Sequence, residues 1–96
     1  MTKYEIMFMV KATLDEKALA TITKDAQKLI TDESGKVIEF KDLGRKKLAY
    51  EINKEVSAFY YLMDVEADSE TIQEFDRKMR INENVIRHLI LRKESE

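Results

Sequence analysis

Residues 58–67 of this 96-residue chain read AFYYLMDVEA, a dense run of aromatic and aliphatic side chains. The run contains no glycine or proline and predicts a strand that is buried on most of both faces. Successive side chains of a strand point to opposite sides. We therefore expect the odd-numbered residues from Phe59 to Val65 to face the core. Tyr60 and Leu62 should then point outward.

Upstream of this run, residues 37–52 are also typical of a strand, but Gly44 interrupts them. An isolated glycine within a strand pattern indicates a bulge or a bend. Residues 53–57, which separate the two segments, are mostly polar and should turn the chain. We therefore expect one long strand, bent at Gly44, before the turn.

The N-terminal part of the chain predicts a strand followed by a helix. Residues 4–10 alternate between apolar core positions and the other face, with the period of two typical of a strand. Thr13, with Glu16 three residues later, fits a capping box, so a helix should begin there. An apolar stripe at helical spacing follows over residues 18–30. The turn after this helix contains Gly35, which can adopt a positive φ.

A second helix is expected after the run of residues 58–67. Asp68 and Ser69 are candidate N-caps, because both side chains accept hydrogen bonds from a first helical turn. Apolar residues recur at helical spacing over residues 72–79. Asn82 and Asn84 tolerate left-handed backbone geometry and can end the helix.

Residues 85–92 form the last predicted strand. Its isoleucines lie at even-numbered positions and its leucines at odd-numbered positions, so the sequence does not decide which face of this strand is buried. The predicted order is βαββαβ, the ferredoxin-like split βαβ plan of the α+β class. Right-handed crossovers place both helices on one face of a four-stranded antiparallel sheet, with the first and third strands central. Residues 1–93 are expected to form this single domain, and residues 94–96 a frayed C-terminus.

The charge is distributed unevenly, although the formal net charge is only −2. Residues 36–54 carry six basic side chains against three acidic ones, and residues 77–93 carry six against one. The rest of the chain carries five basic and fifteen acidic side chains. Such segregation indicates two surfaces with different partners. Accidental clustering in a highly charged small protein is the alternative, and both interpretations stay open at this stage.

Three consecutive cations, Arg45, Lys46 and Lys47, directly follow Gly44. A bulged edge strand with this charge can follow a phosphate backbone, because each neutralised phosphate adds salt-dependent affinity. Tyr50 lies three residues further on, within reach of the same backbone. Lysines on a sheet edge also prevent aggregation, so the pattern alone favours neither role.

Signals for catalysis are missing from the sequence. The only histidine, His88, lies among aliphatic residues of a predicted strand and is interpreted as structural. No serine lies in a nucleophile elbow, and both glycines are isolated. The chain has no cysteine, and one histidine does not make a transition-metal cluster. We therefore predict no enzyme activity, catalytic residue, metal, cofactor or small-molecule substrate.

Four blocks carry a resemblance to a known family. They are residues 4–10 (YEIMFMV), 42–54 (DLGRKKLAYEINK), 74–77 (EFDR) and 81–88 (INENVIRH). In this order and spacing, the chain resembles the bacterial small-subunit ribosomal protein six family over nearly its whole length. The most specific block is glycine, three basic residues, leucine, alanine and tyrosine.

The resemblance implies a non-enzymatic structural component of the small ribosomal subunit in the cytoplasm. It also implies a heterodimer with the basic small-subunit protein eighteen, which binds the central domain of 16S ribosomal RNA. No membrane partner is expected, because no apolar run approaches about 18 residues. The residues expected to contact RNA or the partner are Lys3, Tyr4, Arg45, Lys46, Lys47, Tyr50, Arg80, Asn84, Arg87 and Arg92.

The alternative is a small self-associating ferredoxin-like domain with a regulatory or ligand-binding role. It is motivated by Met7 and Met9, which share the other parity of the first strand, and by the outward-facing Tyr60 and Leu62. Together these four side chains would form an apolar strip on the open face of the sheet. Such a strip is typical of a docking surface.

Overall fold

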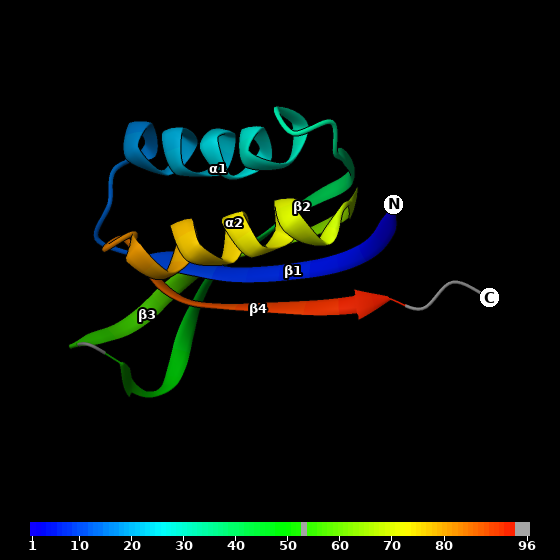
Figure 1. Ribbon diagram of the computed structural model, residues 1–96. Coiled ribbons are helices and arrows are strands. Elements are labelled where there is room, and N and C mark those ends of the chain that lie inside the picture. The colour runs from blue at the N-terminus through cyan, green and yellow to red at the C-terminus, as the bar shows by residue number, and fades with distance from the viewer. Residues whose placement is uncertain (53, 94–96) are drawn as a thin grey trace.

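A computed structural model describes residues 1–52 and 54–93, and it confirms the predicted βαββαβ order (Figure 1). The sheet is antiparallel with the strand order β2-β3-β1-β4, and both helices cover one of its faces. The expected frayed residues 94–96 lie outside the described residues. No helix in the described part of the chain is long and apolar enough to cross a membrane. The elements are β1 (Thr2–Lys11), α1 (Glu16–Thr31), β2 (Lys36–Ile52), β3 (Glu55–Ala67), α2 (Ser69–Ile81) and β4 (Val85–Lys93).

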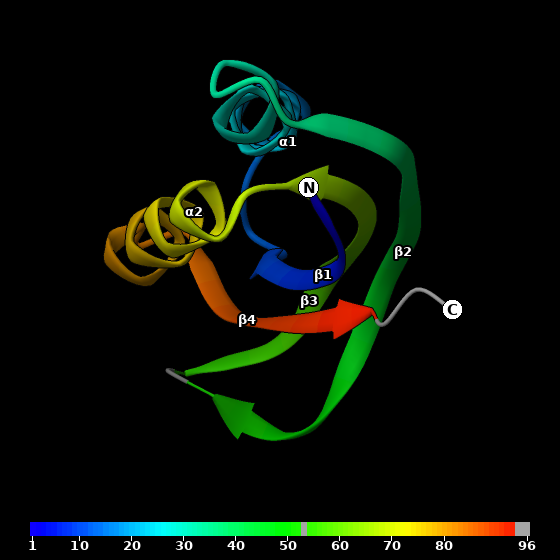
Figure 2. The ribbon, with the colours of Figure 1, turned by 45° about the vertical axis from the view of Figure 1, so that its right-hand side comes forward.

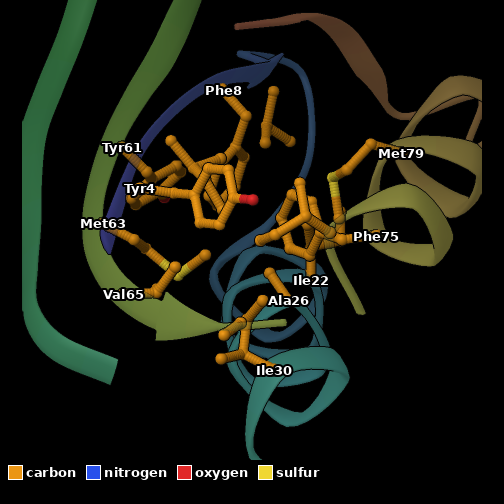
Figure 3. Packing of buried hydrophobic residues seen from close by; sticks show 14 residues of the cluster. Tyr4, Phe8, Ile22, Ala26, Ile30, Tyr61, Met63, Val65, Phe75 and Met79 are labelled. Carbon is orange, nitrogen blue, oxygen red and sulfur yellow. The ribbon is translucent and has the colours of Figure 1, made fainter. Parts of the chain in front are cut away.

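The hydrophobic core lies between the sheet and the two helices (Figure 3). Phe8 of β1 is fully buried, and its ring stacks on that of Tyr61 in β3 with centroids 5.3 Å apart. From the helix side, α1 contributes Ile30 and α2 contributes Phe75, both with no exposed surface. Burial of side chains of this size stabilises a fold by about 1.5–3 kcal/mol each.

The alternation expected in β3 is confirmed, but its burial on both faces is not. Met63 and Val65 are completely buried under the helices, whereas Tyr60 and Leu62 on the opposite face are only partly buried. The reason is that both helices lie on the same side of the sheet, so most of the other face has no covering layer. The predicted open face is therefore present.

The turn between β2 and β3 is shorter than expected. Ile52 pairs directly with Glu55, and residues 55–57, which we assigned to the turn, already belong to β3. Of the two residues between the strands, Asn53 lies outside the described residues and Lys54 has a φ of 67°. Polar residues can belong to the strands of such a hairpin, because each additional pair of residues across the two strands satisfies backbone N–H and C=O groups.

The first helix begins two residues later than the capping-box pattern predicted. Asp15, rather than Thr13, is the N-cap, and its Oδ1 accepts a hydrogen bond of 2.8 Å from the backbone N–H of Ala18. The chain turns immediately before it, where the N–H of Leu14 donates to the carbonyl of Lys11. A carboxylate at this position also interacts favourably with the helix dipole.

The ends of the second helix follow the prediction only in part. Asp68 is the N-cap, in extended conformation, but its side chain makes no capping hydrogen bond. The helix ends at Asn82 as expected, although the φ of −82° is not left-handed. Instead, Oδ1 of Asn82 accepts a hydrogen bond of 2.9 Å from the N–H of Asn84. This side-chain turn leads directly into β4, so left-handed geometry is not needed.

The two glycines serve different purposes. Gly44 has a φ of 80° at a register shift in β2, which confirms the predicted bulge. Gly35 does not supply the positive φ of its turn, since Ser34 does so with 66°. Gly35 is instead required by close packing: a Cβ there would lie 2.6 Å from the carbonyl oxygen of Ile30.

Substitution of the two glycines should therefore have different costs. Gly35→Ala should lower the free energy of unfolding by about 1–3 kcal/mol, because the added methyl overlaps backbone that cannot easily move. Gly44→Asn should cost under about 1 kcal/mol, because asparagine tolerates positive φ and no atom lies within 4 Å of the new Cβ. Urea unfolding of both variants measures the difference, and equal losses would contradict the packing argument.

The open question about β4 is answered by a second bulge. Ile90 lies opposite Ile6 and faces the helices, whereas Leu89 lies opposite Met7 and faces away from them. Near the start of β4 the register shifts, so that Ile86 packs in a small cluster with Met9 on the open face. The extra residue in the bulge changes which face of the sheet the even-numbered and odd-numbered side chains point to. This explains why the apolar residues of β4 do not alternate regularly in the sequence.

Candidate nucleic-acid interface

The outer halves of β2 and β3 extend past the end of β1 as a two-stranded projection, visible at the lower left of Figure 1. The first residue of β3 that pairs with β1 is Ala58, opposite Lys11 at the end of β1. We define the basic ribbon as residues 44–52 of β2 together with residues 55–60 of β3. It curves away from the helices and is not covered by them (Figure 2).

All three consecutive cations of the ribbon are exposed. Arg45 and Lys47 lie opposite Phe59 and Ser57, and Lys46 lies opposite Ala58. The alternation of the strand therefore directs Lys46 to the open face of the sheet and the other two cations to the reverse face. The ribbon can thus present cations to phosphates on either of its two faces.

Local contacts hold two of these cations above neighbouring side chains. The Nε of Arg45 donates a hydrogen bond of 3.3 Å to the hydroxyl of Ser57. The Nζ of Lys46 lies 5.6 Å from the centroid of the Tyr60 ring, a cation–π distance. Neither contact neutralises a positive charge, so both cations can still bind an anion.

Leu48 anchors the ribbon to the rest of the sheet. It is 8% exposed and packs with Met9 and Ala58 in a second hydrophobic cluster, to which Ile52 also belongs. Tyr50 has the same parity as Leu48 but is 63% exposed, because the ribbon has already passed the end of β1. A tyrosine so exposed near three cations can contact a ribose, base or phosphate.

Arg87 lies at the same end of the sheet, on the opposite edge strand. The register places it beside Met9, which lies beside Tyr60, which in turn lies beside Gly44 of the ribbon. This row spans about 14 Å across four strands. Met9, Tyr60 and Arg87 also line a shallow hollow in the open face together with Met7 and Leu89.

The expected apolar strip is thus present on the open face. Met7 lies opposite Leu62 and Met9 opposite Tyr60 in adjacent strands. The sequence pattern did not reveal that Arg87 borders the strip, because that neighbour relation depends on the register in which β4 pairs with β1.

Cations at the other end of the sheet are accompanied by carboxylates. Lys3 lies beside Lys93, whose Nζ is 2.9 Å from Oδ1 of Asp64 and 3.5 Å from Oε2 of Glu5. The hydrogen bond to Asp64, with a smaller contribution from Glu5, raises the pKa of Lys93 above its ordinary value. This end is therefore less suited to a polyanion than the basic ribbon.

The structure places the remaining expected contact residues apart from the ribbon, and one of them must be reassigned. Tyr4 is only 9% exposed and belongs to the core, so its ring is a packing residue. Arg92, beside Tyr4 in the sheet, is exposed. Asn84 is half-buried, and its backbone carbonyl accepts a hydrogen bond from the N–H of Lys11.

Arg80 belongs to a local network on the helix side of the sheet. Its Nη2 is 2.6 Å from Oδ2 of Asp76, whose other oxygen lies 2.6 Å from Nε2 of His88. The side chain of His88 is 14% exposed, and its contact with Asp76 joins β4 to α2. This is the position of a structural histidine. Among residues 1–52 and 54–93, no group of three or more carboxylates or histidines is arranged to hold a metal ion.

The fold and the basic ribbon together define a class: a ferredoxin-like protein that presents cations along an uncovered projection and is suited to binding a polyanion. Comparison with known proteins specifies the family. The family model for ribosomal protein S6 matches residues 3–92, and the chain belongs to this family. It is 42% identical over 94 residues to the small ribosomal subunit protein bS6 of Shouchella clausii. The alignment covers 98% of this chain and 99% of the relative.

A solved structure agrees with this assignment. The crystal structure of the 30S ribosomal protein S6 from Thermotoga maritima superimposes with a TM-score of 0.90 and 26% identity, covering 96% of this chain and 87% of that one. Membership identifies a structural, non-enzymatic component of the small ribosomal subunit, which binds RNA and serves translation in the cytoplasm. It favours the structural ribosomal role over the alternative of a self-associating regulatory domain.

Proposed function

We propose that this protein works as one half of a heterodimer with the basic small-subunit protein eighteen, and that the pair binds the central domain of 16S ribosomal RNA. The observation that carries the proposal is the segregation of charge between the two sides of the fold. Arg45, Lys46 and Lys47 of the basic ribbon take part in none of the ion pairs found among the described residues, and four carboxylates gather in one hollow at the end of the helix layer. A protein of net charge −2 can in this way meet both a polyanion and a basic protein.

The RNA side consists of the basic ribbon and the neighbouring edge of the sheet. Arg45, Lys46 and Lys47 are exposed on both faces of the ribbon, so they can neutralise successive phosphates. Tyr50 and Arg87 extend this surface along and across the sheet. Further candidates are Lys3 and Arg92 at the other end of the sheet, Arg80 on the last turn of α2 and Asn84 in the turn before β4.

The protein side is the acidic end of the helix layer. Glu33, which follows α1, shares a shallow hollow with Asp68, Glu70 and Glu74 at the start of α2. The Arg77 guanidinium forms an ion pair with Glu74 and lowers the pKa of that carboxyl, so Arg77 offsets the charge of Glu74, and Glu33, Asp68 and Glu70 supply the negative charge of this hollow. A carboxylate-rich surface attracts a basic partner and repels RNA, which assigns the two partners to different sides.

The test of this proposal is to measure binding of a 16S central-domain fragment with and without protein eighteen. We expect weak binding by the isolated protein, because few cations contact RNA, and much tighter binding by the pair. Glu33→Gln and Glu70→Gln together should weaken the pair more at low salt than at high salt. Tight binding of RNA by the isolated protein, with no gain from protein eighteen, would refute the heterodimer.

A further inference from the structure

Another hollow lies on the helix side of the sheet, between the first half of α1 and the strands β2 and β3. It has a volume of about 390 Å³, and we call it the aromatic hollow. It lies near the start of α1, whereas the hollow of Glu33 follows the end of that helix, so the two are separate. The side chains that characterise the aromatic hollow are Glu16, Leu19, Phe40, Asp42, Phe59 and Tyr61.

Three aromatic side chains give this hollow its apolar surface. The rings of Phe40 and Tyr61 have centroids 5.7 Å apart and are tilted by 32°. Tyr61 is only 4% exposed, so most of its ring is already packed in the core. Phe40 and Phe59 are half-buried, which leaves part of each side chain accessible from the hollow. Aromatic faces attract cations through the negative charge of their π-systems.

Two carboxylates, Glu16 and Asp42, lie at this aromatic surface. Both are exposed, and neither takes part in an ion pair within the described part of the chain. Asp42 lies opposite Tyr61 in the pairing of β2 with β3, and its Oδ1 accepts a hydrogen bond of 2.8 Å from the N–H of Gly44. Burial, with a smaller contribution from the charge of Asp42, raises the pKa of Tyr61. The carboxylate therefore acts on the aromatic surface directly.

The neighbouring cations do not line the aromatic hollow. Among the described residues that line it, none is basic. Arg45 lies opposite Phe59, but its Nε donates to the hydroxyl of Ser57, which is nearer to the hairpin. Lys17 and Lys24 each follow a lining residue of α1, so they are about 100° further around the helix, where they are exposed.

We infer that the aromatic hollow binds one arginine side chain of a basic protein, with the guanidinium against the aromatic rings and its N–H groups donating to Glu16 and Asp42. A guanidinium is planar, stacks on aromatic faces and hydrogen-bonds to carboxylates. An apolar occupant would cover the two carboxylates without pairing them, which is costly. The phosphates of RNA would be repelled by them. This contact goes beyond the proposed heterodimer and does not depend on it.

The test uses three short peptides, acetyl-Ala-X-Ala-amide, in which X is arginine, citrulline or lysine. Citrulline has nearly the shape of arginine but no charge. In an amide NMR titration, the arginine peptide should shift residues 40–42 and 59–61 and bind roughly 5- to 30-fold more tightly than the citrulline peptide. The lysine peptide should bind less tightly than the arginine peptide, because an ammonium is not planar and is more strongly hydrated.

A double variant tests the two carboxylates. Glu16→Gln with Asp42→Asn removes both charges, and the asparagine keeps an oxygen that can accept from Gly44. Binding of the arginine peptide should weaken roughly 3- to 10-fold, and binding of the citrulline peptide should not change. The matched control is Asp25→Asn with Asp32→Asn, which changes the net charge equally on the side of α1 that faces α2. It should bind the arginine peptide as the parent protein does.

Four results would overturn the inference. They are no response of residues 40–42 and 59–61 to the arginine peptide, equal affinity for the arginine and citrulline peptides, tighter binding of lysine, and an equal loss in the control variant. An equal loss would show that the peptide senses only the overall charge. Each of these results leaves the heterodimer standing, because that proposal is tested with protein eighteen and RNA.

Discussion

Replacement of Arg45, Lys46 and Lys47 together by glutamine should weaken binding of 16S RNA by the heterodimer roughly 50-fold at 0.15 M salt. Each lost cation leaves one phosphate with its counterions, and the entropy of releasing them is no longer gained. All three side chains are exposed on the basic ribbon, so their substitution removes charge without creating a cavity. Filter binding or fluorescence anisotropy with a central-domain fragment measures the loss.

The salt dependence of the same measurement tests the mechanism. The slope of the logarithm of affinity against that of salt concentration should flatten by about 2 to 3. The matched control replaces Lys17, Lys24 and Lys28, which are exposed on α1, and changes the net charge equally. That variant should leave the slope unchanged. An unchanged slope in the ribbon variant would mean that its cations only protect a sheet edge from aggregation.

The second large effect concerns stability. Phe8→Ala should lower the free energy of unfolding by about 3–5 kcal/mol, because it leaves a cavity in the hydrophobic core. Phe8 has no exposed surface, lies in the central strand β1 and stacks on Tyr61. Such a loss is a large fraction of the 5–15 kcal/mol that typically stabilises a domain. Urea unfolding followed by circular dichroism provides the measurement.

The preceding residue supplies the control. Met7 has a similar volume but points to the open face, where it is partly exposed and lies opposite Leu62. Met7→Ala should cost about 1 kcal/mol, since fewer contacts are lost and no closed cavity forms. Comparable losses for the two variants would contradict the one-sided arrangement of the helices, because both faces of β1 would then be equally important.

Local patterns in the sequence were sufficient for the types and order of the elements. The alternation in β1 and the helical stripes of α1 and α2 were read correctly, because each depends on neighbours a few residues away. The errors occurred at element ends. Thr13 and Asp15 both suit an N-cap, and the turn around Leu14 determines which of them is used.

The candidate site, too, could be predicted from the sequence only in part. Arg45, Lys46 and Lys47 were found from their position after Gly44, and the structure places all three on an uncovered ribbon. Tyr4 was expected at the site from the family resemblance alone, which gives no information on the direction of its side chain. The structure puts its ring in the core, 9% exposed.

The sequence by itself determined the βαββαβ order, the bulge at Gly44, the three adjacent cations and the family. These features are encoded by residues close together in the chain. Only the tertiary structure decided that Arg87 lies in one row with Tyr60 and that Lys46 covers that ring. The first relation joins β4 to β3 through β1, and the second depends on the register in which β2 pairs with β3 after the bulge at Gly44. A change of register by one residue moves side chains to the other face, so local sequence patterns do not fix either relation.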